Sequence, residues 1–490
     1  MKINKKSMVK NILITIVILL IHSPLLVGHY STDTYRLIEM GYGKYSIEYS
    51  LNDGRIFMFI IGQIADKINI NINTYVIVLT FLAIIISVVC INLIEKTLKK
   101  YNNKGNIIIA SVIAYVTIMN FMYLENLYFT ECIVMAMSLL LYIIAAKMLN
   151  EGKNIFKVFL LVLLGVFCYQ GTINAFITFY FLFAIIKNNG INKTVLKNMC
   201  IVFAILLISV AINMLQIKIC GKIYGLEQTR IGNVNINTIF FNIIYIIKNI
   251  DKILIQSSEL FPKYLFLIFL SCIMLTIYIW DKKENGETYN FANIILLVIT
   301  AIVSTVVINV ISLSSFGLAR MVFSVGALIG MIYMYLYTTT TIMEKKTIFK
   351  YIMIIILIIY TIINIGNTLN ILISHRKANK LDKQEVLQAN KFISEYESES
   401  GLKVKYIAVT CDKNISWNYK DIKHKSLYTH RALMIWWCNI HAINYFGNRN
   451  LEKAPMDKEI YTENFYGKDW DSLSREQFVF KGDTLYYCVY

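Results

Sequence analysis

The side chains of this 490-residue chain that are best suited to catalysis stand at the ends of its apolar runs. Asp33 follows the first run, and Arg36 lies one helical turn further along the chain. A carboxylate at that depth, with a guanidinium beside it, can accept a proton from a hydroxyl group bound in a cleft. The alternative is that Asp33 caps a short interfacial helix and pairs with Arg36, since charged interfacial pairs are common and need no chemistry.

A second polar cluster interrupts the apolar sequence at residues 124–131. It contains two carboxylates, Glu125 and Glu131, and carboxylates at membrane depth are costly unless they are paired or face a water-filled cavity. We therefore expect both side chains to face the interior of the protein. They either shape a site or hold Arg36 or Arg55 in place.

Two further polar elements complete the set. Gln170 begins a Gln-Gly-Thr turn between two short apolar runs, where it either lines a site or simply forms a tight polar turn. Arg320 is the single basic residue in the short turns 124–128, 170–172 and 312–320. A guanidinium at that depth can hold a phosphate group or serve as an interfacial anchor.

A membrane-embedded helical bundle must position these side chains. The chain is 57% hydrophobic and 16% charged, whereas a soluble domain carries about 25% charged residues. A helix needs about 20 apolar residues to cross a bilayer, and the first run lacks a signal-peptide cleavage site, so we expect it to be retained. The predicted fold class is a polytopic α-helical membrane protein of about eleven spans. We place the spans at 12–28, 75–94, 107–123, 129–146, 158–169, 173–186, 199–217, 264–280, 291–311, 321–343 and 351–373.

The formal charge of +17 indicates how the loops are distributed across the membrane. Six short segments hold 19 basic but only six acidic residues, and the positive-inside rule places them in the cytoplasm of a multi-pass cell-membrane protein, together with the N-terminus. Loop 29–74, the other polar elements and the chain after the last span then lie outside. Nucleic-acid binding is excluded, because the basic residues form no single stripe. The six segments are 1–10, 95–106, 147–157, 187–198, 281–290 and 344–350.

The chain divides in composition into a multi-span domain, 1–373, and a polar C-terminal domain, 374–490. In the second domain we predict a strand at 403–410, a partly buried helix at 428–445, and a hairpin of strands 477–480 and 484–490, which together make a small extracytoplasmic α/β domain. The sequence has no CxxC pair, HExxH or P-loop, so no standard metal or nucleotide site is predicted and no cofactor is expected. Three cysteines, Cys411, Cys438 and Cys488, leave room for one disulfide in this domain, and the sequence leaves open whether it forms.

The convergence of all four polar elements on one face points to chemistry there. A carboxylate, arginines and many aromatic rings suit the transfer of a sugar from a lipid-linked donor, because rings cover the apolar face of a sugar and a cation holds the lipid phosphate. A transporter or flippase of lipid-linked sugars is the main alternative, although it typically shows repeated broken spans with ionisable residues at the midplane. A non-catalytic protein that presents the outer domain to a glycan is a third interpretation.

Beyond these general patterns, the chain resembles the Gtr type II glucosyltransferases, bacterial membrane proteins of the GT-C architecture linked to O-antigen glucosylation. The resemblance extends from residue 30 to the C-terminus and rests on short motifs in order. The motifs are Asp33-x-x-Arg36, Asp53-Gly54-Arg55, Leu124-Glu125-Asn126-Leu127-Tyr128, Met135-Ala136-Met137-Ser138, Tyr169-Gln170, Arg320 and Lys481-Gly482-Asp483.

The resemblance implies transfer of a hexose, usually glucose, from a polyprenyl-phosphate carrier to a cell-surface glycan, with inversion. By that resemblance Asp33 is the catalytic base and Arg320 holds the phosphate, and the matched positions that shape the site are Arg36, Arg55, Glu125, Glu131 and Gln170. Family members often carry two adjacent acids where this chain has Thr32 and Asp33, and an aspartate where it has Glu131. These departures leave the acceptor and the sugar open, and assistance by a divalent metal is not excluded.

Overall fold

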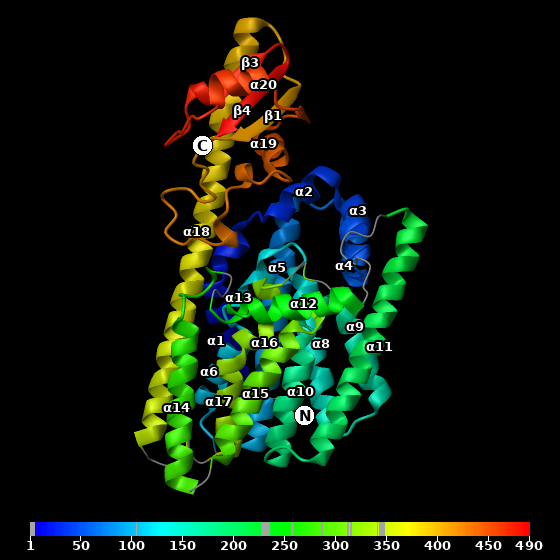
Figure 1. Ribbon diagram of the computed structural model, residues 1–490, viewed down its shortest axis with the longest axis vertical. Helices are drawn as coiled ribbons and strands as arrows, with labels where there is room; N and C mark the ends of the chain where they lie inside the picture. The colour runs from blue at the N-terminus through cyan, green and yellow to red at the C-terminus, as the bar shows by residue number, and fades with distance from the viewer. Residues whose placement is uncertain are drawn as a thin grey trace.

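The structure is a long helical bundle that carries a small sheet-containing domain at one end (Figure 1). It is a computed structural model that describes residues 5–103, 105–226, 236–255, 259–285, 288–310, 313, 316–340, 342 and 348–490. We call the end of the bundle next to the sheet the domain end, and the opposite end the distal end.

Within the described residues, seven helices are long and apolar enough to cross a membrane, and an eighth span results if α1 and the bent segment after it are counted together. The chain is therefore a helical membrane protein. The long helices are α5 (Ile72–Tyr101), α8 (Cys132–Asn150), α10 (Asn174–Asn188, together with the turn before it), α11 (Lys193–Tyr224), α14 (Leu265–Asn285), α15 (Tyr289–Val306) and α18 (Ile348–Ser400), and α1 spans Lys5–Ile21.

Three shorter apolar helices account for the remaining predicted runs: α6 (Ile107–Ile118), α9 (Ile155–Cys168) and α17 (Leu328–Thr339). The prediction that 158–169 and 173–186 are two helices is confirmed, since η3 (Gln170–Thr172) separates α9 from α10.

Helix α12 (Ile236–Lys248) is not among the spans predicted from the sequence. It lies crosswise over the upright helices (Figure 1). It is too short to span, and its apolar residues Phe240, Phe241 and Ile247 are exposed, as is usual for a helix that lies in a membrane interface.

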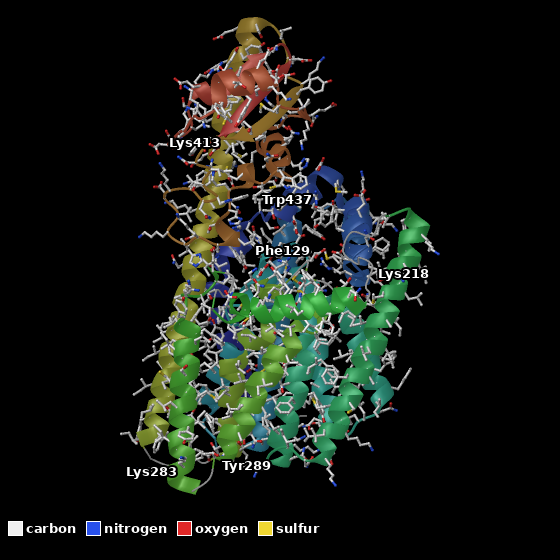
Figure 2. All side chains as sticks on the ribbon, viewed as in Figure 1. Phe129, Lys218, Lys283, Tyr289, Lys413 and Trp437 are labelled. Atoms are coloured by element: carbon white, nitrogen blue, oxygen red, sulfur yellow. The ribbon has the colours of Figure 1, made fainter. Side chains whose placement is uncertain are left out.

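The distal end gathers the segments that the charge pattern assigned to the cytoplasm. Figure 2 shows Lys283 and Tyr289 there, far from Phe129 and Trp437. The contacts that join these segments include the ion pair Lys10–Glu95, the ion pair Lys100–Glu151 at 2.9 Å and the hydrogen bond from Lys187 Nζ to the Asn150 carbonyl at 2.6 Å.

The predicted first loop is mostly helical. It forms α2 (Thr32–Met40), α3 (Tyr42–Tyr45), the π-helical turn η2 (Ser46–Leu51) and α4 (Ile56–Ile68) at the domain end. Gly41 permits the sharp turn from α2 into α3, because its φ of 74° lies in the left-handed region that other residues avoid.

The C-terminal domain is built on the continuation of α18, which runs unbroken through residue 374. Its four-stranded sheet has the order β2-β1-β4-β3, with β1 parallel to both neighbours and β3 antiparallel to β4, so the predicted hairpin is confirmed. The predicted strand at 403–410 begins later, at Tyr406. The strands are β1 (Tyr406–Cys411), β2 (Glu452–Lys453), β3 (Phe478–Lys481) and β4 (Thr484–Val489).

The predicted helix at 428–445 is wrong in its first half. The structure has two 3₁₀ turns, η8 (Leu427–Thr429) and η9 (Ala432–Met434), before the helix α19 (Asn439–Gly447). Side chains of α18 explain the difference: the Asp382 carboxylate accepts the Ala432 N–H at 3.2 Å, and Glu385 pairs with the buried Arg431. These contacts hold the segment against α18.

The three cysteines of the C-terminal domain form no disulfide, because all nine cysteines lie among the described residues and all are free. In the parallel pair of β1 and β4, Cys411 lies opposite Val489 and Cys488 lies opposite Thr410. Since successive residues of a strand point to opposite faces, the two thiols lie on opposite faces of the sheet. Cys438 is buried in a separate cluster with Tyr35.

Candidate active site

Asp33 lies in the first turn of α2, where a helix N-terminus favours negative charge. The turn is fixed by a capping box, in which the Ser31 N–H donates to Thr34 Oγ1 at 3.0 Å. The next helical residues tie α2 to the C-terminal domain, since Tyr35 is buried against Ala432 and Cys438. The Asp33 side chain is therefore half-buried on a rigid helix between the bundle and that domain.

Arg320 and Glu125 form an ion pair at the same end of the bundle. The Arg320 Nη1 group donates to Glu125 Oε1, and the Arg320 backbone N–H donates to Glu125 Oε2 at 3.1 Å. The guanidinium carbon lies 4.7 Å from the centroid of the Phe129 ring. Burial lowers the pKa of Arg320, but the charges of Glu125 and, to a smaller extent, Asp33 outweigh burial, so its pKa is raised. Arg320 therefore stays cationic and lies within electrostatic range of Asp33.

A second ion pair joins Arg55 to Glu131. The Arg55 Nη2 group also lies 3.2 Å from Asp53 Oδ2, and its guanidinium carbon is 5.3 Å from the centroid of the Tyr169 ring. Glu131 accepts a further hydrogen bond from Ser50 Oγ at 3.4 Å. Glu131 thus holds Arg55, whereas Glu125 holds Arg320 rather than either arginine of the first loop.

Gln170 joins three parts of the chain. Its Nε2 donates to the Asp53 carbonyl at 2.9 Å and to Asn213 Oδ1 at 3.0 Å, and Asn213 Nδ2 in turn donates to the Gly54 carbonyl at 2.9 Å. This chain of amides fixes the turn that carries Arg55. The turn at 170–172 is therefore tight and polar, and it also supports the site.

The guanidinium carbon of Arg36 lies 4.9 Å from the centroid of the Tyr49 ring in η2. The two ion pairs and the electrostatic interaction of Arg320 with Asp33 bring Asp33, Arg55, Glu125, Glu131 and Arg320 together. Figure 2 shows the position of Phe129, whose ring contacts Arg320.

Two buried tyrosines lie between the charged groups. Burial raises the pKa of Tyr45, and the charges of Asp33 and Glu131 raise it further. Burial also raises the pKa of Tyr169, which lies within range of both Arg320 and Arg55. Both phenols therefore stay neutral, and each can hydrogen-bond to a ligand or to a nearby polar group without adding charge.

The C-terminal domain contacts the segment that carries Glu125. The Tyr428 hydroxyl donates to the Leu124 carbonyl, and the rings of Tyr428 and Tyr128 lie 4.3 Å apart. The domain therefore fixes α7 (Leu124–Tyr128) as well as α2.

Sequence reasoning missed several residues that hold the site, namely Tyr45, Ser50, Asn213 and the side chain of Asp53. Asn213 had a readable signal, because it is an amide inside an apolar run. Among the residues that the structure describes, no group of three or more His, Cys, Asp or Glu side chains is arranged to hold a metal ion.

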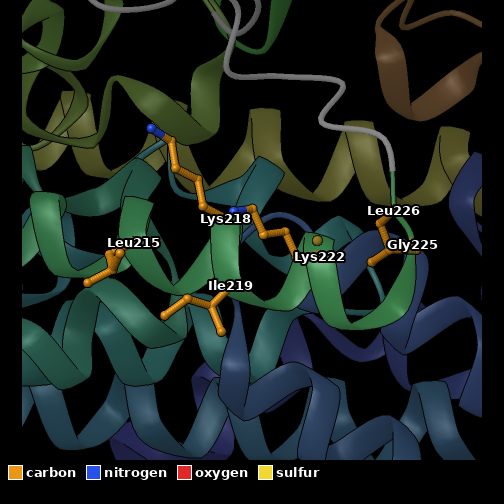
Figure 3. A pocket seen from close by; sticks show the side chains of 7 residues that line it. Leu215, Lys218, Ile219, Lys222, Gly225 and Leu226 are labelled. Carbon is orange, nitrogen blue, oxygen red and sulfur yellow. The ribbon is translucent and has the colours of Figure 1, made fainter.

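A pocket of about 610 Å³ opens beside the last turns of α11, on the same helix as Asn213 (Figure 3). Its wall is mostly apolar, with two exposed lysines one turn apart, Lys218 and Lys222. The lining residues in the described part of the chain are Leu215, Lys218, Ile219, Gly221, Lys222, Gly225 and Leu226.

Comparison with known proteins gives one finding. A family model described as Glucosyl transferase GtrII matches residues 22–339, which is more than half of the chain and includes Asp33 and Arg320. No curated protein and no solved structure matches the chain.

Proposed function

The chain belongs to the GtrII glucosyl transferase family, and we propose that it moves glucose from a polyprenyl-phosphate carrier to a cell-surface glycan. Membership makes it a hexosyltransferase, and its apolar helices place it in a membrane. The observation that carries the finer proposal is the position of Asp33 within electrostatic range of Arg320 at the domain end of the bundle. A base for the acceptor and a cation for the departing phosphate are the two groups that the transfer needs.

In the proposed reaction Asp33 accepts the proton of an acceptor hydroxyl. The hydroxyl oxygen attacks the anomeric carbon of the glucose as the bond from that carbon to the phosphate oxygen breaks. The electron pair of that bond leaves with the polyprenyl phosphate, and the anomeric configuration is inverted. Support for this role comes from the rigid, capped helix that carries Asp33 beside the two ion pairs.

Arg320 is the residue we assign to the phosphate. A guanidinium presents five N–H donors, so it can be held by Glu125 while it also binds a phosphate oxygen. Positive charge there stabilises the negative charge that develops on the leaving group.

The remaining candidate residues are assigned positioning roles. Glu125 orients Arg320, Glu131 orients Arg55, and Gln170 fixes the Arg55 turn. Arg36, one helical turn from Asp33 on α2, is assigned to the side of the site that the acceptor enters.

We assign the carrier lipid to the pocket on α11. Its apolar wall suits a polyprenyl chain, and Lys218 and Lys222 suit attraction of the anionic donor from the membrane surface before its phosphate reaches Arg320. The domain end is proposed to face outward and the N-terminus inward, because the basic segments gather at the distal end.

The function is tested with full-length protein in proteoliposomes that contain radiolabelled polyprenyl-phosphate glucose. We expect label to move to the host's surface polysaccharide, and no transfer when UDP-glucose replaces the lipid donor. Transfer from the nucleotide sugar would contradict the proposal. Movement of intact lipid-linked glucose across the bilayer without transfer would identify a flippase instead.

A further inference from the structure

The segment 436–441, which leads into α19, lies against the helix that carries Asp33. Tyr35 of α2 is buried in one cluster with Cys438, and Trp437 packs on that cluster. The His441 Nε2 atom lies 2.7 Å from Glu39 Oε2 of the same helix. The segment is thus attached to α2 at two points, and Figure 2 shows Trp437 between the sheet domain and the bundle.

The electrostatics of Cys438 show how near this segment comes to the site. Burial raises the pKa of the Cys438 thiol, the charges of Asp382 and Asp33 raise it further, and Arg36 lowers it. Because the charges of Asp33 and Arg36 act on its pKa, the Cys438 thiol lies at the border of the proposed site. The two residues immediately before it are tryptophans.

Trp436 is an exposed aromatic residue with two neighbours. Its side chain is 70% exposed, and its ring stands nearly perpendicular to that of Trp437, with 5.6 Å between the ring centroids. Lys453 Nζ lies 5.9 Å from the centroid of the Trp436 ring. An exposed large aromatic ring beside a cation is suited to act as a binding anchor.

We propose that Trp436 stacks on a hexose ring of the acceptor glycan, and that Trp437, Lys453 and the Glu39–His441 pair border this subsite. The flat indole covers the apolar face of a sugar ring, while the ammonium, imidazole and carboxylate groups hydrogen-bond to hydroxyls at its edge. A glycan held there passes Asp33, and its next residue presents a hydroxyl to that carboxylate. Only the identification of the ligand as the acceptor rests on the proposed function.

A membrane anchor is the other common role of an exposed tryptophan. The position of Trp436 argues against it. The segment belongs to the domain that stands beyond the ends of the apolar helices (Figure 1), and the ammonium group of Lys453 in β2 lies over the indole.

Binding of oligosaccharides tests the subsite without any donor lipid. The probe is the mixture of oligosaccharides that mild acid releases from the surface polysaccharide of the cells that produce this protein. It is titrated calorimetrically into the full-length protein in detergent. We expect Trp436→Ala to weaken binding about tenfold or more, and Trp436→Phe to weaken it less. Trp417→Ala is the matched control, since Trp417 is also exposed but packs on His430 elsewhere in the domain.

An unchanged affinity of Trp436→Ala, an equal loss in Trp417→Ala, or no binding by the wild-type protein would overturn the proposal. Quenching of Trp436 fluorescence by brominated phosphatidylglycerol vesicles, without any effect of the oligosaccharide, would identify a membrane anchor instead. The two proposals fail separately. Trp436-dependent binding without glucose transfer would refute the function alone, whereas transfer with an unchanged acceptor KM in Trp436→Ala would refute the subsite alone.

Discussion

Each of the two buried glutamates at the site lies against an arginine. Glu125 is 2% and Glu131 7% exposed in its side chain, and each forms an ion pair. Removal of one partner from such a buried pair costs about 3–5 kcal/mol, because the other charge is left without compensation. The pairs therefore hold two cations at defined positions beside Asp33.

The role assigned to Arg320 makes a prediction about substrates. Arg320→Ala is expected to weaken binding of the polyprenyl-phosphate donor about tenfold or more, because a charge-assisted hydrogen bond to the phosphate is lost. Acceptor binding is expected to change little. Donor and acceptor affinities are measured separately by titration. Equal loss for both substrates would mean that Arg320 supports the site only through Glu125.

The sequence alone identifies the charged residues of the site but not their partners. Glu131 pairs with a residue 76 positions away, and Glu125 with one 195 positions away. Such pairs depend on how the helices tilt and rotate against one another, and no local pattern specifies that. Arg36 illustrates the limit, because its spacing from Asp33 does not reveal that its guanidinium lies over the Tyr49 ring of η2.

At the scale of elements, the turn before α4 positions Arg55 through its backbone. Gly54 has a φ of 78°, and a Cβ atom added there would lie 2.5 Å from Asn213 Nδ2. Asn213 cannot move without losing its hydrogen bonds to Gly54 and Gln170. These hydrogen bonds therefore hold the turn, α11 and η3 in fixed positions relative to one another.

Gly54→Ala is expected to lower stability by about 2 kcal/mol and to reduce turnover, because strain in the left-handed region adds to the clash. The matched control is Gly152→Ala, since Gly152 has a φ of 70° but nothing within 4 Å of an added Cβ. Thermal unfolding in detergent compares the two. Equal losses would show that Asn213 does not constrain the turn.

The last turns of α11 carry Lys218 and Lys222, the two lysines of the pocket wall. The double variant Lys218→Gln and Lys222→Gln is expected to raise the KM for the lipid donor about tenfold while kcat stays near normal, because each lysine near an anionic headgroup contributes about 1 kcal/mol. The control removes two lysines from the other end of the same helix, Lys193 and Lys197. An equal rise in the control would place the carrier lipid elsewhere.

Most of the helices could be predicted from apolar runs, since length and hydropathy are local properties. Helix α12 is absent from the predicted spans because its 13 residues are too few to cross a bilayer. The error at 428–445 has a different origin. Its pattern suits a helix, but contacts from Asp382 and Glu385 on α18 hold the backbone in separate turns.

The whole molecule is polarised along its long axis. Basic segments and their ion pairs occupy the distal end, whereas the site, the pocket and the C-terminal domain occupy the other. The orientation we propose, with the site outside, follows from applying the positive-inside rule to this polarity.

Cysteine labelling in intact cells tests that orientation. Lys413→Cys in the C-terminal domain is expected to react with a membrane-impermeant maleimide, and Lys283→Cys at the distal end only after permeabilisation (Figure 2). The wild-type protein gives the background from the native cysteines. The reverse pattern would place the site in the cytoplasm and contradict an outer-face acceptor.

The central claim is that Asp33 is the base, and the most direct measurement is glucose transfer by purified full-length Asp33→Asn. The amide keeps the shape of the side chain but cannot take up the proton, so turnover is expected to fall about 10²–10⁴-fold. Donor binding and the unfolding midpoint are expected to stay unchanged, and Glu48→Gln, another carboxylate of the first loop, serves as control. Near-normal turnover by a correctly folded Asp33→Asn protein would contradict the account.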